Sequence, residues 1–400
     1  MPPVLTIAAA ASVAIWLYLL LGRGRFWRAA TPLDGPAPAR RRWPAVAAII
    51  PARDEAAIIA PVVASVLAQD YPGPFAVLLV DDHSTDGTAA LAARAADVAG
   101  RLTVVAAAPL PAGWAGKVWA LSEGVARAAA AAPDARYLWF TDADIAHDPD
   151  TLRRLVAKAE AGDCDLVSLM VGLACRGFWD RLLIPPFVFF FRMLYPFAWV
   201  NDPRRGTAAA AGGCLLVRRD ALDRAGGLAA FRGALIDDCA LAARIAGGGR
   251  DGGGRLWLGL TDRSRSIRPY AGLTGIWRMV ARSAYTQLNR SPLLLAGTLV
   301  GMALTYLAPP LAVLAYPLHG AASAAGAGLV AWTLMAAAIA PTLRLYHQPA
   351  ALGLALPAAA LLYCAMTVDS ALRHATGRGG RWKGRVQAAG KRSRGPGVLG

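Results

Sequence analysis

Short apolar runs alternate with segments of helical periodicity through the first half of the chain. The runs at 45–50 and 75–80 are continuously apolar, as strands buried on both faces are. Residues 56–68 repeat apolar positions at helical spacing, and residues 84–87 offer capping side chains for a helix over 88–98. The same alternation continues with strands at 102–106, 137–141 and 165–170, a helix after Lys117 and a helix from Asp148–Pro149. This order predicts an α/β domain with a doubly wound (Rossmann-like), mostly parallel sheet.

Long apolar segments lie at both ends of the chain. Residues 4–21 form one uncharged run, close to the length of a membrane span. Arginines follow this run instead of preceding it, which favours an uncleaved anchor with its C-terminal end in the cytoplasm over a signal peptide. From Leu293 to Val368 the only formal charge is Arg344. That region divides into apolar segments at 293–318, 323–341 and 350–368.

The number of membrane passes stays open at this stage. Three full passes after the anchor would place the basic tail outside, whereas the charge bias favours it inside. One C-terminal segment is then re-entrant, or Pro309–Pro310 divide the first into two short helices. Residues 184–200 combine seven aromatic residues with Arg192 and three prolines. We expect a membrane-interface element there, with a segment of the domain core as the alternative.

Composition and charge support this division. The net charge is +16, but the basic residues gather beside the apolar segments, which indicates membrane lipids as partners and no nucleic acid. The five cysteines show no C-x-x-C spacing, as is typical of reduced cytosolic thiols. The predicted domains are an N-terminal transmembrane anchor (1–22), a basic Pro-rich linker (23–44), a cytosolic catalytic domain (45–290), a C-terminal transmembrane region (291–368) and a basic tail (369–400).

Three acidic clusters mark where chemistry is expected. Asp81–Asp82 and Asp142–Ala–Asp144 each follow a predicted buried strand, and Asp237–Asp238 opens a helical run. Ligands of open α/β sheets bind beyond the carboxyl ends of the strands, so these carboxylates should converge. Like charges at one point are unfavourable unless a cation offsets them. Asp142 and Asp144 leave an extended chain on the same side and would suit Mg²⁺ or Mn²⁺ bridged to a diphosphate, unless they are only solvated turn carboxylates.

Other residues near the strand ends have open roles. Asp54 and Glu55 can accept hydrogen bonds from a nucleobase or ribose, or can simply complement a helix dipole. Asp237–Asp238 can supply a general base or only cap a helix. Arg278 and Arg282 lie one helical turn apart and could hold a departing diphosphate or lie over lipid headgroups.

Several motifs together resemble a known family. PARDE, VDDHSTDGT, TDADI, GGCLLVRRDAL and IDDCALAARI, in this order, resemble the GT-A family 2 glycosyltransferases over residues 45–290. The segments WLYLLLGRGRFWR, LLIPPFVFFFRMLYPFAWVNDPRR and AMTVDSALRH…WKGR are similar to the hopanoid-biosynthesis-associated membrane glycosyltransferases. The resemblance implies a nucleotide-diphosphate sugar donor and inversion at the anomeric carbon.

The resemblance also implies roles for individual residues. Asp238 would be the general base, with Asp237 in the place of the family's Glu, and Arg282, together with Lys117, would stabilise the leaving diphosphate. The donor nucleotide would be contacted by Pro51, Arg53, Asp54, Glu55, Asp81, Asp82, Lys117 and Asp142. The metal would be held by Asp142 and Asp144, and the acceptor side would be formed by Gly212, Gly213 and Cys214.

These features together predict an inverting glycosyltransferase of the bacterial inner membrane, with a cytosolic catalytic domain. The expected donor is a nucleotide-diphosphate sugar, a UDP-sugar first, and the expected acceptor a hopanoid or polyprenyl-type lipid. Processive relatives carry Gln-x-x-Arg-Trp, whereas residues 279–283 here read MVARS, which favours transfer of a single sugar. The alternatives are a processive polysaccharide synthase and a non-catalytic membrane scaffold that binds nucleotide sugars.

Overall fold

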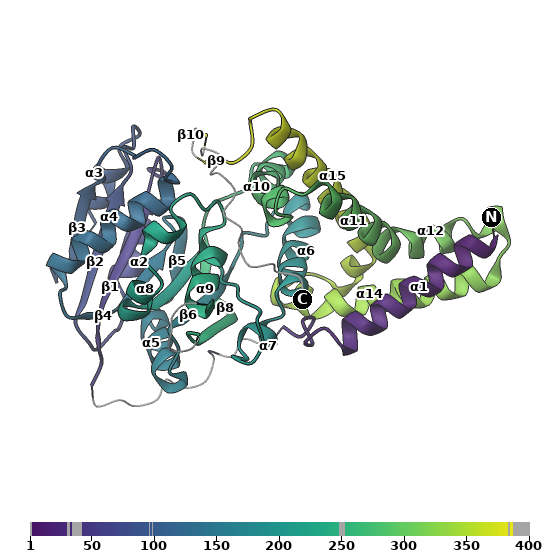
Figure 1. The fold of residues 1–400 in the computed structure, drawn as a ribbon, viewed down its shortest axis with the longest axis horizontal. Coiled ribbons are helices and arrows are strands. Elements are labelled where there is room, and N and C mark those ends of the chain that lie inside the picture. Colours follow the sequence, from purple (N-terminus) through teal and green to yellow (C-terminus); the bar gives the residue numbers. More distant parts are fainter. Residues whose placement is uncertain are drawn as a thin grey trace. The chain divides into compact units, whose positions relative to one another are not determined.

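The computed structural model describes residues 2–29, 33, 42–95, 97, 99–247, 253–382 and 385–386. Most of the expected linker, part of the glycine-rich stretch at 247–254 and most of the basic tail lie outside these residues. The chain forms two compact units (Figure 1). We call residues 30–173, 199–269 and 381–400 the sheet unit, and residues 1–29, 174–198 and 270–380 the helical unit.

The sheet unit alternates strands and helices along the chain. Its strands are β1 (Ala45–Ala52), β2 (Phe75–Asp81), β3 (Leu102–Ala106), β4 (Ala135–Thr141), β5 (Ile145–His147), β6 (Leu166–Gly172), β7 (Cys214–Arg218), β8 (Leu256–Ser266) and the short pair β9 (Arg381–Trp382) and β10 (Arg385–Val386). Its helices are α2 (Ile59–Leu67), α3 (Thr88–Ala93), α4 (Gly116–Ala131), α5 (Thr151–Gly162), α8 (Arg219–Arg224), the 3₁₀ turn η1 (Leu228–Phe231) and α9 (Asp237–Gly247).

Eight strands form one mostly parallel sheet in the order β3-β2-β1-β4-β7-β6-β8-β5. Strands β1, β2, β3 and β4 run parallel, as do β6 and β8. Strand β7 is antiparallel to both of its neighbours, and β5 is antiparallel to β8. The prediction of a doubly wound α/β sheet is confirmed, and the carboxyl ends of β1, β2 and β4 lie at one edge of the sheet.

Helices cover both faces of this sheet, which explains its continuous apolar strands. Ile50 of β1 belongs to the core shared with α2 and α5, whereas its neighbour Ile49 faces α4. Gly124 of α4 packs so closely that a Cβ there would lie 2.4 Å from Ile49 Cγ2. Successive strand residues point to opposite faces, so both faces of β1 are buried.

Several predicted boundaries were wrong. The helix predicted over 88–98 ends at Ala93. Strand β1 does not end before Pro51 but continues through it to Ala52, because pairing with β4 stops at Ile49 and Pro51 pairs only with β2. Helix α5 begins at Thr151 and not at Asp148–Pro149. The backbone N–H of Asp148 donates to Arg263 O of β8 at 2.7 Å, so this stretch is held against the sheet before the helix begins.

His147 is a buried histidine at the end of β5. Its ring nitrogens lie 2.7 Å from Thr141 Oγ1 and 2.8 Å from Ser264 Oγ, and its ring centroid lies 4.7 Å from that of Trp139. Burial lowers the pKa of His147 to about 3, so the imidazole is neutral in the folded protein. It therefore joins β4, β5 and β8 just beside the Asp142–Asp144 turn.

We expect the stability of the protein to fall below about pH 6.5 because of His147. The unfolded chain binds the proton at an ordinary histidine pKa and the folded chain only near pH 3, so each pH unit between them costs up to about 1.4 kcal/mol. Thermal melting of detergent-solubilised protein between pH 7.5 and 4.5 should show this slope. In His147→Gln, which cannot titrate, the slope should be shallower; an unchanged slope would assign the pH dependence to other groups.

The helical unit contains the apolar segments. Its elements are α1 (Pro2–Leu21), α6 (Phe178–Leu194), α7 (Phe197–Val200, at its boundary with the sheet unit), α10 (Gly272–Gln287), α11 (Pro292–Met302), the π turn η2 (Ala303–Leu307), α12 (Ala308–Leu314), α13 (Tyr316–His319), α14 (Ala322–Leu345), the 3₁₀ turn η3 (Ala350–Ala355) and α15 (Leu356–Ala375). Five segments among the described residues are long and apolar enough to cross a membrane: Pro3–Leu21, Phe178–Val200, Pro292–Leu314, Ala322–Leu345 and Ala350–Ala375.

The segment that contains Pro309–Pro310 continues through both prolines. Proline has no N–H, so Pro309 cannot donate to the carbonyl of Thr305 four residues earlier. In the structure that carbonyl accepts instead from Trp16 Nε1 at 3.0 Å and from Ser12 Oγ at 3.3 Å, both on α1. The π turn η2 therefore docks against the N-terminal helix, and the two prolines do not split the segment into separate helices.

Residues 184–200 also form more helix than their composition suggests. Pro185 and Pro186 lie inside the continuous helix α6. The buried Arg192 donates to Thr342 Oγ1 of α14 at 3.2 Å and to the carbonyl oxygen of Arg28. Packing against α10, α14 and α15 thus outweighs the low helix propensity of proline.

Candidate active site

The loops that follow β1 and β2 are joined by hydrogen bonds. Asp54 Oδ1 accepts from the backbone N–H of Thr85 at 2.9 Å, and the backbone N–H of Asp54 donates to Ser84 Oγ at 2.9 Å. The backbone N–H of Glu55 donates to Thr88 Oγ1 at 2.8 Å. Asp54 has a φ of 51°, and these bonds offset the cost of that left-handed conformation. The two predicted nucleotide loops therefore form one structural element.

The two adjacent acids after β2 differ in their surroundings. Asp82 is fully buried, and its carboxylate lies 3.7 Å from Arg53 Nη1 and 3.3 Å from His83 Nδ1. The carbonyl oxygen of Asp82 also accepts from Arg53. Asp81 Oδ2 accepts from the backbone N–H of Ser84 at 3.2 Å, while its buried Oδ1 has no hydrogen-bond partner among the described residues. Asp82 is thus placed to hold Arg53, and Asp81 has an acceptor available for a ligand.

Asp142 follows β4 and pairs with a lysine from another element. Its Oδ1 lies 2.7 Å from Nζ of Lys117, in the first turn of α4, and the same Nζ lies 3.4 Å from Asp237 Oδ2. The backbone N–H of Asp142 donates to the carbonyl of Gly213 at 3.4 Å. Lys117 therefore brings together two acidic clusters that are far apart in the sequence.

Asp144 pairs with an arginine that the sequence analysis did not identify. Its Oδ2 accepts from Arg268 Nε and from Ser266 Oγ, both at 3.1 Å. Nη2 of the same guanidinium lies 2.5 Å from Glu55 Oε1. Arg268 therefore links the loop after β1 to the Asp142–Asp144 turn.

Asp238 is fixed by the backbone of the predicted acceptor loop. Its Oδ2 accepts from the N–H of Gly212 at 2.7 Å, and its Oδ1 accepts from the N–H of Cys239 at 2.8 Å. A Cβ at position 212 would lie 3.1 Å from Asp238 Oδ2 and 3.2 Å from Lys117 Nζ, so a side chain there would crowd both groups. This close approach explains why residue 212 is a glycine.

Cys214 is placed differently from its two neighbours in the loop. It is fully buried in β7, and its sulfur accepts from Trp139 Nε1 at 3.4 Å. Burial raises the pKa of the Cys214 thiol to about 12. Cys214 is therefore a residue of the sheet core, and the acceptor-side prediction depends on Gly212 and Gly213.

The charges in this cluster do not balance. Burial alone would lower the pKa of Lys117, but the charges of Asp142 and Asp237 hold it above its ordinary value. Burial raises the pKa of Asp142, and the neighbouring charge of Asp144 raises it further, against the opposing charge of Lys117. Burial and the adjacent Asp237 raise the pKa of Asp238 to about 6. The negative charges thus outnumber the positive ones.

The donor set fits a divalent cation that shares its ligands with a substrate. Five carboxylates, those of Glu55, Asp142, Asp144, Asp237 and Asp238, lie around two cations of the described residues, Lys117 and Arg268. Among the described residues no group of three or more His, Cys, Asp or Glu is arranged to hold a metal alone. Oxygen donors of this kind suit Mg²⁺ or Mn²⁺, with phosphate oxygens or water completing the coordination.

Arg282 belongs to the helical unit, whereas the residues of the acidic cluster belong to the sheet unit. It is exposed on α10, one turn after the exposed Arg278, while Ile276, Val280 and Ala281 face the interior of the helical unit. Its predicted role with the leaving diphosphate stays a prediction.

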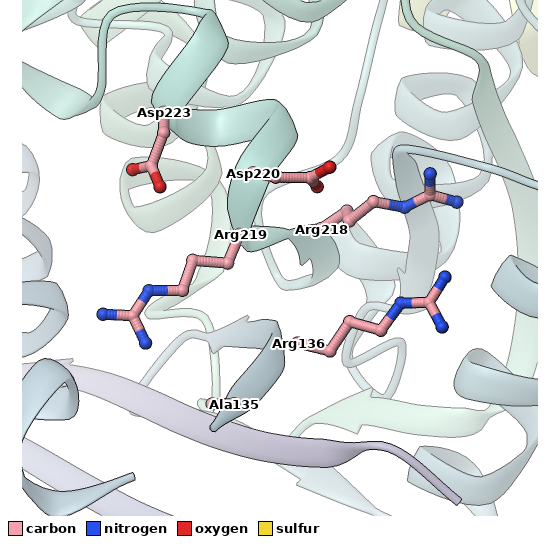
Figure 2. Close-up of a pocket in the computed structure, with 6 residues that line it drawn as sticks. All are labelled: Ala135, Arg136, Arg218, Arg219, Asp220 and Asp223. Carbon is pink, nitrogen blue, oxygen red and sulfur yellow. The ribbon is translucent and has the colours of Figure 1, made fainter. Parts of the chain in front are cut away.

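A surface hollow of about 320 Å³ lies at the other end of β4 (Figure 2). It is lined by Ala135, Arg136, Arg218, Arg219, Asp220 and Asp223. Figure 2 shows Arg136 and Arg218 pointing the same way, and these guanidiniums lie 3.4 Å from Glu160 and 2.6 Å from Asp163. Ala135 begins β4 whereas Asp142 follows its end, so this hollow is separate from the acidic cluster.

Comparisons with known proteins bear on the family and the fold. Residues 47–226 match the family model described as Glycosyl transferase family 2. The mannosyltransferase PcManGT from Pyrobaculum calidifontis, solved with GDP-Man and Mn²⁺, is 21% identical, with a TM-score of 0.55 over 94% of this chain and 99% of its own. No curated protein matched the chain in sequence.

Two further solved structures are more distant. Glucosyl-3-phosphoglycerate synthase from Mycobacterium tuberculosis, solved with Mn²⁺, UDP and glucosyl-3-phosphoglycerate, is 21% identical, with a TM-score of 0.38 over 62% of this chain and 80% of its own. TarS from S. aureus is 14% identical, with a TM-score of 0.38 over 60% of this chain and 39% of its own. The likeness to the mannosyltransferase identifies the fold as GT-A, and residues 47–226, a little under half of the chain, match the family 2 model. The chain is therefore an enzyme, a glycosyltransferase.

Proposed function

We propose that this glycosyltransferase moves one sugar from a nucleotide-diphosphate sugar to a lipid hydroxyl, with inversion at the anomeric carbon. The observation that supports it most is the meeting of Asp142, Asp144, Asp237 and Asp238 around Lys117 and Arg268 at the edge of one sheet. These groups can bind a diphosphate with its cation, and they place a carboxylate next to the acceptor loop.

Donor binding would use the joined loops after β1 and β2. Asp81 offers a buried, unpartnered Oδ1 that can accept from a nucleobase N–H, and Asp82 positions Arg53 beside it. The backbone of Pro51, Asp54 and Glu55 shapes the floor of this site. The donor base stays open between UDP, which the resemblance favours, and other nucleotides.

The diphosphate would bind nearer to Asp142 and Asp144. Asp142 and Asp144 would hold Mg²⁺ or Mn²⁺ there, and the ion would neutralise charge that develops on the leaving diphosphate. Lys117 lies 2.7 Å from Asp142, so its ammonium group could also donate to a diphosphate bound there.

Asp238 would act as the general base. As the lipid oxygen forms its bond to the anomeric carbon, the bond from that carbon to the diphosphate oxygen breaks. The hydroxyl proton passes to the Asp238 carboxylate, and the bonding electrons leave with the diphosphate. Two backbone N–H groups hold the carboxylate beside Gly212, where an acceptor would lie.

We expect the transfer rate to depend on the ionisation of Asp238. Because its pKa is raised to about 6, kcat/KM should fall about tenfold per pH unit below pH 6 and level off above it. Asp237→Asn removes the like charge that raises this pKa, so the acid limb should move to lower pH. Initial rates between pH 4.5 and 8.5 measure the acid limb of the profile in both enzymes. An acid limb at the same pH in Asp237→Asn as in the wild type would contradict the assignment of the base.

The membrane acceptor is supported by the path of the chain. Strands β6 and β7 are hydrogen-bonded neighbours in one sheet, and α6 lies between them in sequence. Both ends of the intervening segment must therefore lie on the same side of a bilayer. Although α6 has the length and apolarity of a span, it cannot cross once and still return to this sheet. We place it in the membrane interface, where its aromatic residues would contact the lipid acceptor.

The other apolar segments would anchor the enzyme in the bacterial inner membrane, with the sheet unit in the cytosol. Because β9 and β10 also belong to the sheet unit, two of the three C-terminal segments would cross the bilayer and the third would not cross it fully. By its resemblance to the hopanoid-associated enzymes, we take the acceptor to be a hopanoid or polyprenyl-type lipid.

The proposal is tested by offering detergent-purified protein a panel of UDP- and GDP-sugars together with a bacterial lipid extract and Mg²⁺ or Mn²⁺. Mass spectrometry should find one lipid that gains the mass of one sugar. A ladder of added sugars would instead identify a processive synthase, and unchanged lipids with intact donor would indicate a non-catalytic scaffold.

A further inference from the structure

The guanidinium of Arg268 is paired with Asp144, one of the carboxylates proposed to hold the cation. Its Nε lies 3.1 Å from Asp144 Oδ2, and its Nη2 lies 2.5 Å from Glu55 Oε1. Ser266 Oγ donates to the same Asp144 oxygen at 3.1 Å. Both carboxylates that would hold the metal are therefore paired with a positive charge from this chain, Asp142 with Lys117 and Asp144 with Arg268.

The backbone keeps Arg268 at this place. The N–H of Ile267 donates to the carbonyl oxygen of Asp144 at 2.9 Å, so the residue before Arg268 is fixed to the turn that carries the carboxylate. The side chain of Arg268 is 36% exposed, so it can turn toward solvent without breaking that backbone bond. The guanidinium is thus anchored at its base and free to move at its tip.

A divalent cation and this guanidinium compete for the same oxygen. Mg²⁺ and Mn²⁺ bind carboxylate oxygens at about 2.0–2.2 Å, and two positive groups so close to one oxygen repel each other. A bound diphosphate would change this competition. Its oxygens can bind a guanidinium in bidentate fashion, as carboxylates do, so the Arg268 side chain could leave Asp144 and Glu55 for the diphosphate. Glu55 would then remain as the group to which Arg268 returns after the diphosphate departs.

We propose that Arg268 is an internal counter-ion that excludes the divalent cation from Asp144 until a nucleoside diphosphate draws its guanidinium away. The inference rests on the proposed donor site and adds an order to it: the protein binds metal weakly by itself and well only together with the nucleotide. Between turnovers, Arg268 would hold the carboxylates of Asp144 and Glu55 in place while no metal is bound.

The test measures Mn²⁺ binding directly, from the free-ion EPR signal of the full-length protein in detergent. Arg268→Gln should bind Mn²⁺ about tenfold more tightly than the wild type in the absence of nucleotide, because Asp144 loses its competing cation. The factor by which UDP or GDP tightens Mn²⁺ binding should shrink correspondingly in this variant. Unchanged or weaker Mn²⁺ binding by Arg268→Gln alone would overturn the proposal, and an unchanged nucleotide effect would overturn the transfer of the guanidinium to the diphosphate.

Arg265→Gln is the matched control. Arg265 lies on β8, three residues before Arg268, and its Nη2 pairs with Asp148 Oδ1 at 2.9 Å instead of with Asp144. Its Mn²⁺ affinity should equal that of the wild type. Arg268→Lys keeps the charge but cannot reach both carboxylates, so we expect a Mn²⁺ affinity between those of the wild type and Arg268→Gln. If Arg268→Gln does not fold, the comparison is made with Arg268→Lys.

The outcomes separate this inference from the proposed function. A wild type that transfers sugar, with Arg268→Gln unaltered in Mn²⁺ binding, would remove the inference and leave the function. If Arg268→Gln bound Mn²⁺ more tightly but the wild type transferred no sugar, the inference would stand and the proposed function would be removed.

Discussion

Asp238→Asn should slow sugar transfer by about 10²–10⁴-fold while nucleotide-sugar binding is retained. The amide has the shape of the carboxylate but cannot take the acceptor's proton. One of the two backbone N–H groups, of Gly212 or Cys239, can still bond the remaining side-chain oxygen, so the loop should keep its position. Initial rates of lipid glycosylation measure the first effect, and titration with nucleoside diphosphate measures the second.

Two control variants sharpen this result. Asp237→Asn changes the adjacent carboxylate, which lies 3.4 Å from Lys117, and should cost less activity than Asp238→Asn. Asp220→Asn changes an exposed carboxylate beside the hollow of Figure 2 and should leave the rate unchanged. If Asp238→Asn kept most of the activity, or if Asp237→Asn were the more damaging change, the base would have to be reassigned.

The second large effect is expected for Asp144→Asn. Removing one of two carboxylates that would hold the cation should lower transfer by at least about 100-fold and raise the Mn²⁺ concentration needed for half-maximal activity. Excess Mn²⁺ should restore part of the rate, which separates weakened metal binding from loss of the fold. Treatment of the wild type with a chelator should abolish transfer, and added Mg²⁺ or Mn²⁺ should restore it.

Asp148→Asn is the control for this substitution. Asp148 lies four residues further along the chain, just after β5, and pairs with Arg265 at 2.9 Å, outside the acidic cluster. We expect an unchanged metal requirement for that variant. An Asp144→Asn enzyme that needs no more Mn²⁺ than the wild type would show that Asp144 is not a metal ligand.

The sequence was sufficient for the part of the fold that depends on local pattern. Strands buried on both faces must be continuously apolar, so β1, β2 and β4 were recognisable, and their carboxyl ends located Asp81, Asp142 and Asp144. The predicted ends of strands and helices were wrong where contacts with residues distant in the sequence determine where an element begins or ends. Pro51 continues a strand because only one neighbour pairs there, and the start of α5 is delayed by a bond from Asp148 to β8.

The pairing of charges could not be predicted in the same way. Arg268 lies 213 residues from Glu55 and 124 residues from Asp144 along the chain, and it follows a strand whose place in the sheet no local pattern reveals. Lys117 was noted in the sequence, but its contact with both Asp142 and Asp237 depends on the order of β4 and α9 in space. The surroundings of Asp82 and Cys214, both fully buried, likewise follow from packing and not from motif position.

The central claim is that one site, formed at the ends of β1, β2 and β4, binds both the metal and the nucleotide. An experimental structure of the purified enzyme with Mn²⁺ and UDP or GDP, in which anomalous scattering locates the manganese, tests it most directly. We expect manganese within bonding distance of an Asp144 oxygen and of the diphosphate, with the Arg268 guanidinium turned away from Asp144 toward a phosphate oxygen. Nucleotide and manganese bound elsewhere, as in the hollow at the start of β4, would contradict it.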